Sequence, residues 1–270
     1  MIKRLGLIAG GGDFPLLFAR TAKDKGISLI CIAIKDEASP ELEKLVDKTY
    51  WISFGEVKKA IDILKKEKIK KAVMLGKITK TRIFKEEDRS TIDDRGNLIL
   101  KLAKDKRDLT IFKTGAKLLR LYGIKIVSCL ICLRENLAQK GCLTKRPPSS
   151  REWEDIRFGY KIAKRLSGLD IGQAVVVKDK VVLSVEAIEG TDSAIKRASI
   201  LGNGEVVVVK VARPNQDMRF DVPVIGIHTI NSLKEGKASC LALEKNKTLI
   251  INKEELTKAA DEAGISVVVI

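Results

Sequence analysis

The sequence predicts an α/β protein whose N-terminal half holds a parallel sheet and whose C-terminal half has a mixed α+β structure. Two observations support this fold class. Residues 1 to about 130 alternate short apolar runs with amphipathic stretches of helical period, which is the pattern of parallel strands joined by helices. Beyond residue 150, apolar runs also follow one another across a short polar turn, which is typical of a hairpin.

The N-terminal half contains the elements of a doubly wound sheet. The expected strands are residues 2–10, 27–34, 48–54, 70–78 and 124–133, and the expected helices are 14–26, 39–46, 56–69, 93–106 and 109–123. Val57, Ala60, Ile61 and Leu64 show the i, i+3, i+4, i+7 spacing of a helix that buries one face. Strands and helices in this order predict a Rossmann-like domain over residues 1–130.

The second half has a different pattern. Paired prolines and serines in residues 143–156 mark a loop, so we place a linker at 131–150 and a mixed α/β domain at 151–270. Residues 172–187 alternate around Lys178-Asp179-Lys180 and predict a β-hairpin. A helix is expected over 191–202 with Thr191 as its cap, and a second over 254–264.

Composition narrows the class of protein. Apolar residues make up 45% of the 270, and no run approaches the roughly 20 that a membrane span needs. The apolar run at the start is shorter than the core of a signal peptide, so we expect a cytoplasmic protein. A net charge of +16 suits a polyanionic partner, although surface lysines of a thermophilic protein would also explain it.

The cysteines and the histidine argue against several kinds of site. Cys129 and Cys132 form a CxxC, but it lies in an apolar run, and no second pair completes a zinc site. We therefore expect both to be small buried hydrophobes. His228 is the one histidine, which makes a Ser-His-Asp hydrolase an unfavoured interpretation.

The glycine turn Gly10-Gly11-Gly12-Asp13 is the first candidate binding element. Glycines after a strand let backbone N–H groups approach a phosphate, and the following helix adds its dipole. The GxGxxG pattern is incomplete because Pro15 stands in place of its last glycine. A diphosphate or sugar-nucleotide is therefore favoured over NAD, and a tight turn without a ligand is the alternative.

A second polar stretch follows the predicted hairpin. Glu186, Glu189 and Asp192 lie within seven residues, and Gly190-Thr191 begins a helix. A helix N-terminus with a hydroxyl suits a phosphate, and carboxylates suit a hydrated divalent ion. An ordinary helix start with acidic residues in its first turn is the alternative.

The third candidate is the loop that contains Gln216, Asp217, Arg219 and Asp221. Two carboxylates four residues apart, among arginines, have the composition of a metal-assisted phosphate site. The alternative is that the aspartates only pair with neighbouring arginines. His228 follows closely and could join this site, although a lone histidine is more often structural.

Four motifs together carry a family resemblance. IAGGGDFP (8–15), LGKITKTRIF (75–84), VEAIEGTD (185–192) and KVARPNQDMRFDVPVIG (210–226) occur in an order that resembles the LpxI family, the UDP-2,3-diacylglucosamine pyrophosphatases of lipid A biosynthesis. The resemblance implies two domains that close over the substrate, with the second as the catalytic domain. It also implies hydrolysis at the α-phosphorus to lipid X and UMP, with Mg²⁺ or another divalent cation.

The resemblance also implies site residues and partners. Asp217 and Asp221, with Asp221 slightly preferred, would carry catalysis and hold the metal. Substrate would be bound by Gly10, Gly11, Gly12, Asp13, Gly76, Lys77, Glu189, Gly190, Thr191, Asp192, Gln216 and Arg219. The partner would be an amphiphilic UDP-sugar lipid. Peripheral contact with an anionic membrane, such as the inner membrane, would explain the basic charge, and a homodimer stays open.

Two rival functions remain open from sequence. Asp36, at the end of the second expected strand, could bind the ribose of NAD or NADP in a Rossmann-type oxidoreductase. A nucleic-acid-binding protein would use the positive charge, but aromatic residues make up only 4% of the chain and no nucleic-acid-binding motif is present. We therefore expect no specific nucleic-acid partner.

Overall fold

The computed structural model describes residues 2–78, 90–105, 108–220 and 222–270. The chain divides into two compact units. Unit 1 comprises Met1–Arg134 together with Asp217–Asp221, and unit 2 comprises Glu135–Gln216 together with Val222–Ile270. The second half of the sequence therefore contributes a short segment to the first unit.

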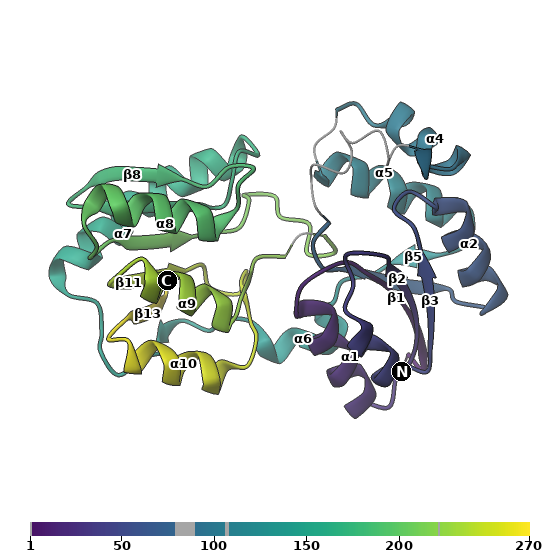
Figure 1. Cartoon of the computed structure of the whole chain (residues 1–270), viewed down its shortest axis with the longest axis horizontal. Helices are drawn as coiled ribbons and strands as arrows, with labels where there is room; N and C mark the ends of the chain where they lie inside the picture. Colours follow the sequence, from purple (N-terminus) through teal and green to yellow (C-terminus); the bar gives the residue numbers. More distant parts are fainter. Residues whose placement is uncertain (1, 79–89, 106–107, 221) are drawn as a thin grey trace. The chain divides into compact units, whose positions relative to one another are not determined.

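Unit 1 has the strand–helix alternation that the sequence predicts (Figure 1). Its strands are β1 (Arg4–Ala9), β2 (Ser28–Ile34), β3 (Lys48–Ile52), β4 (Lys71–Leu75) and β5 (Lys125–Ile126). Its helices are α1 (Phe14–Asp24), a 3₁₀ turn at Pro40–Lys44, α2 (Val57–Lys66), α4 (Asp94–Leu102), α5 (Asp108–Leu121) and α6 (Leu130–Leu133).

The sheet of unit 1 is parallel throughout, in the order β3-β2-β1-β4-β5. The chain adds β2 and β3 on one side of β1 and then returns to add β4 on the other. The carboxyl ends of β1 and β4 therefore form a topological switch point, which is where open α/β sheets bind ligands. One buried cluster joins this sheet to α2, α4 and α5.

One expected strand of unit 1 is a strand over only two residues and ends in a short helix. Residues 124–133 contribute only the two-residue β5, after which Cys129 precedes α6. Cys129 and Cys132 are both buried, and burial raises the pKa of the Cys129 thiol to about 12. They are thus small buried residues, as expected, and neither forms a disulfide.

Unit 2 contains more strands and a second set of helices. Its strands are β6 (Gly141–Cys142), β7 (Ala174–Lys178), β8 (Val181–Val185), β9 (Val207–Lys210), β10 (Val224–Ile225), β11 (Cys240–Leu243), β12 (Leu249–Ile250) and β13 (Ser266–Val269). Its helices are a 3₁₀ turn at Arg134–Asn136 that begins at the last residue of unit 1, α7 (Ser150–Gly168), α8 (Thr191–Gly202), α9 (Ile227–Glu235) and α10 (Lys253–Glu262).

The main sheet of unit 2 is mixed, which confirms the predicted class. Its order is β6-β13-β11-β9-β7-β8, with β9, β11 and β13 parallel and the outer strands antiparallel. Alternate strand residues pack against α8, α9 and α10 on one face and against α7 on the other (Figure 1). β10 and β12 form a separate two-stranded parallel sheet.

Two local features follow directly from the sequence. The hairpin of β7 and β8 turns at Asp179 and Lys180, which both have positive φ, as the tight turn of a two-residue hairpin requires. Ser149 and Glu152 form a capping box that begins α7, because each side chain accepts a hydrogen bond from the other's backbone N–H. By contrast, Gly190 rather than Thr191 precedes α8 as its N-cap.

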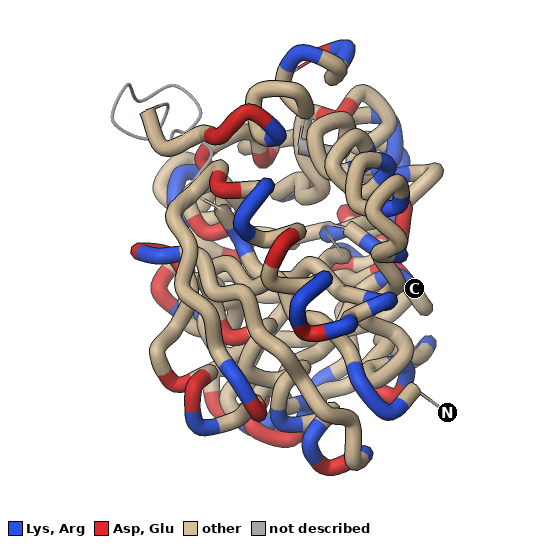
Figure 2. Tube along the Cα trace, turned by 90° about the vertical axis from the view of Figure 1, so that its right-hand side faces the viewer, with Lys and Arg blue, Asp and Glu red and all other residues tan. Residues whose placement is uncertain are grey.

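The charge that gives +16 is spread over many elements. Lysines and arginines alternate with acidic residues along the trace in Figure 2. None of the helices in the described ranges combines the length and apolar character that a membrane crossing requires.

Candidate functional site

The glycine turn after β1 lies against the turn after β4. Gly10 N–H donates to the Leu75 carbonyl at 2.8 Å, and Gly11 and Lys77 exchange two backbone hydrogen bonds of 2.8 and 2.9 Å. Two elements that the sequence assigned separately to substrate binding therefore meet at the switch point of the sheet. The rest of the LGKITKTRIF motif, from residue 79, lies outside the described residues.

Close backbone approach explains two of these glycines. A Cβ on Gly76 would lie 2.6 Å from the carbonyl carbon of Gly10, and a Cβ on Gly10 would collide with the carbonyl oxygen of Lys77. The backbone N–H groups of Gly10 and Gly11 donate to the β4 turn, so a role of these two residues in binding a phosphate stays a prediction. Gly12 differs: its φ is +87°, and an added Cβ would meet no atom within 4 Å.

Residues 217–220, which we call the strap, belong to unit 1. Phe220 is buried in the core of that unit and stacks on Phe112 of α5, with ring centroids 6.1 Å apart. The hydroxyl of Ser128 donates to the carbonyl of Met218 at 2.6 Å. The sequence assigned this stretch to the second domain; a large aromatic side chain that fills the core of unit 1 fixes it there instead.

Asp217 and Arg219 form an ion pair on the strap. The Arg219 Nε and Nη2 atoms donate to the two carboxylate oxygens at 2.9 and 2.7 Å. These hydrogen bonds lower the pKa of Asp217 despite its partial burial, and the charge of Lys113 acts in the same direction. Asp217 is therefore an ionised carboxylate at neutral pH. Asp221, the other expected catalytic residue, lies outside the described residues.

Gln216 and His228 are not part of the strap's unit. Gln216 accepts a hydrogen bond from the backbone of Arg213 at 3.3 Å, and Arg213 pairs with Asp170 at 2.6 Å. His228 is an exposed residue of α9. Both belong to unit 2, whereas Asp217 and Arg219 belong to unit 1.

Residues 186–192, which we call the acidic turn of unit 2, are held in place by hydrogen bonds and an ion pair of their own polar side chains. Thr191 Oγ1 donates to Glu186 at 2.7 Å and accepts from Lys210 Nζ at 2.8 Å. Glu189 pairs with Arg197 at 2.9 Å, and Asp192 accepts from the hydroxyl of Ser232 at 3.0 Å. The sequence placed these residues together correctly, but it did not identify Lys210, which the parallel strand β9 presents beside the start of α8.

A metal centre is not complete in the described part of the chain. No three His, Cys, Asp or Glu side chains gather there closely enough to hold an ion. Of the two expected metal ligands, only Asp217 is described, and both of its oxygens accept hydrogen bonds from Arg219. The described residues alone therefore do not fit a Mg²⁺ ion, which prefers several carboxylate or water oxygens.

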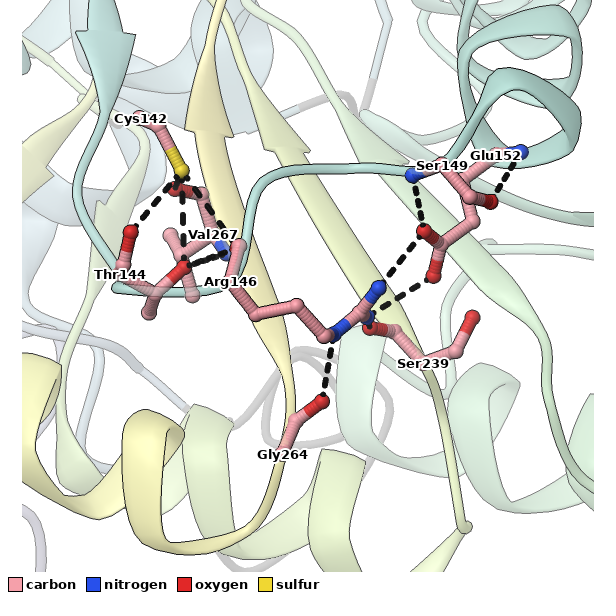
Figure 3. A network of polar contacts seen from close by, with 8 residues as sticks. All are labelled: Cys142, Thr144, Arg146, Ser149, Glu152, Ser239, Gly264 and Val267. Atoms are coloured by element: carbon pink, nitrogen blue, oxygen red, sulfur yellow. Dashed lines mark hydrogen bonds and ion pairs between the residues drawn. The ribbon is translucent and has the colours of Figure 1, made fainter.

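A separate polar network in unit 2 links the loop before α7 to the sheet (Figure 3). Arg146 donates two hydrogen bonds of 2.9 Å to Glu152, one of 2.9 Å to the Gly264 carbonyl and a further one to the Ser239 carbonyl. Burial acts to raise the pKa of Glu152, but the hydrogen bonds from Arg146 and from Ser149 outweigh it and lower the pKa to about 2. This network is structural, and the sequence analysis did not predict it.

Sequence reasoning also missed Ser128. It is the hydroxyl residue that directly follows the apolar run of β5, and a polar residue at the carboxyl end of a parallel strand is a usable signal. Residues 124–133 form one nearly continuous apolar run that predicts a single buried strand, so Ser128 falls inside the expected strand and not at its end.

Comparison with known proteins finds a family match for each half of the chain. Residues 4–135 match the LpxI N-terminal domain, and residues 139–268 match the LpxI C-terminal domain. A protein of Caulobacter vibrioides named UDP-2,3-diacylglucosamine pyrophosphatase LpxI is 28% identical over 98% of this chain and 97% of its own length.

Solved structures give only distant likenesses. The biotin carboxylase subunit of a pyruvate carboxylase is 13% identical, with a TM-score of 0.29, over 70% of this chain and 39% of that one. A biotin carboxylase of Campylobacter jejuni is 15% identical, with a TM-score of 0.26, over 74% of this chain and 42% of that one. The chain thus spans less than half the length of these structures, and the likeness carries no argument. The two domain matches, in order and over nearly every residue, show that the chain belongs to the LpxI family.

Proposed function

We propose that the protein hydrolyses the pyrophosphate bond of UDP-2,3-diacylglucosamine in lipid A biosynthesis. The observation that supports this is the match along 98% of the chain to a relative that bears the name of this activity. Water adds to the α-phosphorus, and the bridging oxygen leaves with the sugar phosphate. The products are UMP and 2,3-diacylglucosamine 1-phosphate (lipid X).

The strap and the residue that follows it supply the charged groups that this reaction needs. Asp217 of the strap and the adjoining Asp221 are the proposed catalytic carboxylates. Arg219 uses two of its five N–H donors on Asp217, so further donors are left for phosphoryl oxygens, whose developing charge they would stabilise. Gly12 and Asp13, with Lys77 beside them, are the proposed contacts of unit 1 to the substrate.

We also propose that a divalent cation is required. A bound Mg²⁺ would neutralise phosphoryl charge and activate water. Because Arg219 occupies the oxygens of Asp217, ligation by Asp217 would require that this ion pair opens. If the cation is required, EDTA should abolish the release of UMP, and added Mg²⁺ should restore it.

The deciding experiment follows both products from one substrate. Purified protein is incubated with UDP-2,3-diacylglucosamine in H₂¹⁸O with Mg²⁺, and a parallel sample contains EDTA. UMP that carries ¹⁸O, together with unlabelled lipid X, would support attack at the α-phosphorus. Label in the lipid X phosphate would contradict that position of attack, and no release of UMP with any divalent ion would contradict the function.

The partners of the reaction follow from the substrate. Two acyl chains keep it in a bilayer, so we propose peripheral contact with an anionic membrane, supported by the net charge of +16. Co-sedimentation with phosphatidylglycerol vesicles that weakens with salt would agree with this. A homodimer is testable in the same preparations by light scattering.

A further inference from the structure

The strap is held in unit 1 by two contacts of different kinds. Phe220 packs in the core, and Met218 accepts a hydrogen bond from Ser128, a residue 90 positions away in the sequence. The aromatic contact fixes one end of the strap. The hydrogen bond fixes the peptide unit between Asp217 and Arg219.

The Ser128 hydroxyl is itself fixed in orientation. It donates to Met218 at 2.6 Å and accepts from the backbone N–H of Leu130 at 3.2 Å. The preceding residue, Val127, donates its N–H to the carbonyl of Ala72 in β4 at 2.8 Å. Ser128 therefore stands on the carboxyl edge of the sheet, and its hydroxyl joins the strap to that edge.

The peptide unit that Ser128 holds sets the position of the ion pair. Within the strap, Phe220 N–H donates to the Asp217 carbonyl at 2.9 Å, and Arg219 N–H donates to the Asp217 carboxylate at 3.2 Å. These bonds fold the strap upon itself but do not attach it to the sheet. Without the Ser128 hydroxyl, Phe220 would still anchor the strap, but Asp217 and Arg219 would gain freedom to move relative to β4 and β5.

We propose that Ser128 is a positioning residue of the enzyme: its hydroxyl holds the Met218 carbonyl and so places Asp217 and Arg219 at the carboxyl edge of the sheet of unit 1. This rests on the proposed function, because it assumes that the strap carries the catalytic groups. Catalytic groups that move by an ångström or so lose rate even when the fold is kept.

The test compares three variants. Ser128→Ala removes the hydroxyl, and Ser128→Thr keeps it. Thr21→Val is the control, because it removes another partly buried hydroxyl of unit 1, at a residue far from the strap in sequence. That hydroxyl donates to the Leu17 carbonyl at 2.9 Å. We expect Ser128→Ala to lower kcat by about 10- to 100-fold with KM nearly unchanged. Its Tm should fall no more than that of Thr21→Val, and Ser128→Thr should recover most of the rate.

A second measurement does not depend on activity. Amide hydrogen exchange of Arg219 and Phe220 should be at least about 10-fold faster in Ser128→Ala than in the wild type, and unchanged in Thr21→Val. Wild-type kcat in Ser128→Ala, or unchanged exchange, would overturn the proposal. If the wild type itself releases no UMP while exchange still responds, the hydroxyl positions the strap and the proposed function is what has failed.

Discussion

The strap of unit 1 and the acidic turn of unit 2 are both polar segments with carboxylates beside basic residues, but they are held in opposite ways. The strap is held through a backbone carbonyl and the ring of Phe220. Among the described residues, its two charged side chains form an ion pair with each other, and the Arg219 guanidinium also lies over the Phe220 ring. The turn from Glu186 to Asp192 is held by its own polar side chains. A loop fixed by backbone and apolar contacts keeps its polar groups for chemistry, whereas a loop fixed by its polar groups has used them.

Removing the carboxylate of the strap tests this comparison most severely. We expect Asp217→Ala to lower the rate of UMP release by about 100- to 1,000-fold, because the carboxylate that is proposed to position the attacking water is lost and the guanidinium of Arg219 loses the partner that orients it. Asp221→Ala is expected to be similarly inactive. Thermal unfolding of both variants should match the wild type. Wild-type rates in both would show that the strap is not catalytic.

The anchor of the strap is expected to matter for stability. Phe220→Ala leaves a cavity in the core of unit 1 and should lower the free energy of unfolding by about 3–5 kcal/mol. Urea titration checks this, with the exposed Asn215→Ala as the control. A loss below about 1 kcal/mol would mean that the strap is not held by its ring.

The two turns at the switch point should respond differently to alanine. Gly76→Ala forces a Cβ against the backbone of Gly10 at a φ of +95° and should cost more than about 2 kcal/mol. Gly12→Ala meets open space and should cost about 1 kcal/mol for its positive φ alone. Urea unfolding of both variants measures the difference, and equal losses would contradict the tight pairing of the two turns.

Acid should lower the free energy of unfolding of both units, in each through the protonation of one glutamate. The pKa of Glu152 in unit 2 is lowered from 4.5 to about 2, chiefly by Arg146 and Ser149 against the effect of burial, and that of Glu67 in unit 1 is lowered to about 2 by Lys48 and Tyr50. A carboxylate whose pKa is lowered in the folded state stabilises that state at any pH above the ordinary pKa of a glutamate. This stability is lost as the pH falls from about 4.5 to about 2.

Glutamine at either position separates the two contributions. Glu152→Gln should flatten the fall of unfolding free energy over that range more than Glu67→Gln. Glu152 accepts two guanidinium hydrogen bonds and one from the backbone N–H of Ser149, whereas Glu67 pairs with the half-exposed Lys48, whose charge solvent screens. Urea midpoints at a series of pH values give the slopes. Identical slopes in the wild type and both variants would show that neither pair is linked to folding.

The smallest effect is expected in the turn of unit 2. Thr191→Val removes the hydroxyl that bonds Glu186 and Lys210 and should cost about 1 kcal/mol of stability. Because that hydroxyl already has partners, KM should change by no more than about threefold. A rise in KM above tenfold would make the turn a substrate-binding element and would remove the contrast with the strap.

Local patterns in the sequence determined much of this protein. Apolar periodicity fixed the strand–helix alternation of unit 1, and the short turn after Lys178 fixed the hairpin, because both depend on neighbours a few residues apart. The motifs also sufficed to identify the LpxI family. They placed the glycine turn after the first strand, where the structure has it.

Only the tertiary structure decided which parts of the chain work together. The strap joins unit 1 because Phe220 fills a core built from residues more than ninety positions earlier, and no local pattern records that contact. For the same reason the sequence could not show that Gly10 and Gly11 donate to the β4 turn. Hydrogen bonds and cavities between distant segments depend on the packed geometry of the whole unit, and that geometry exists only once the chain has folded.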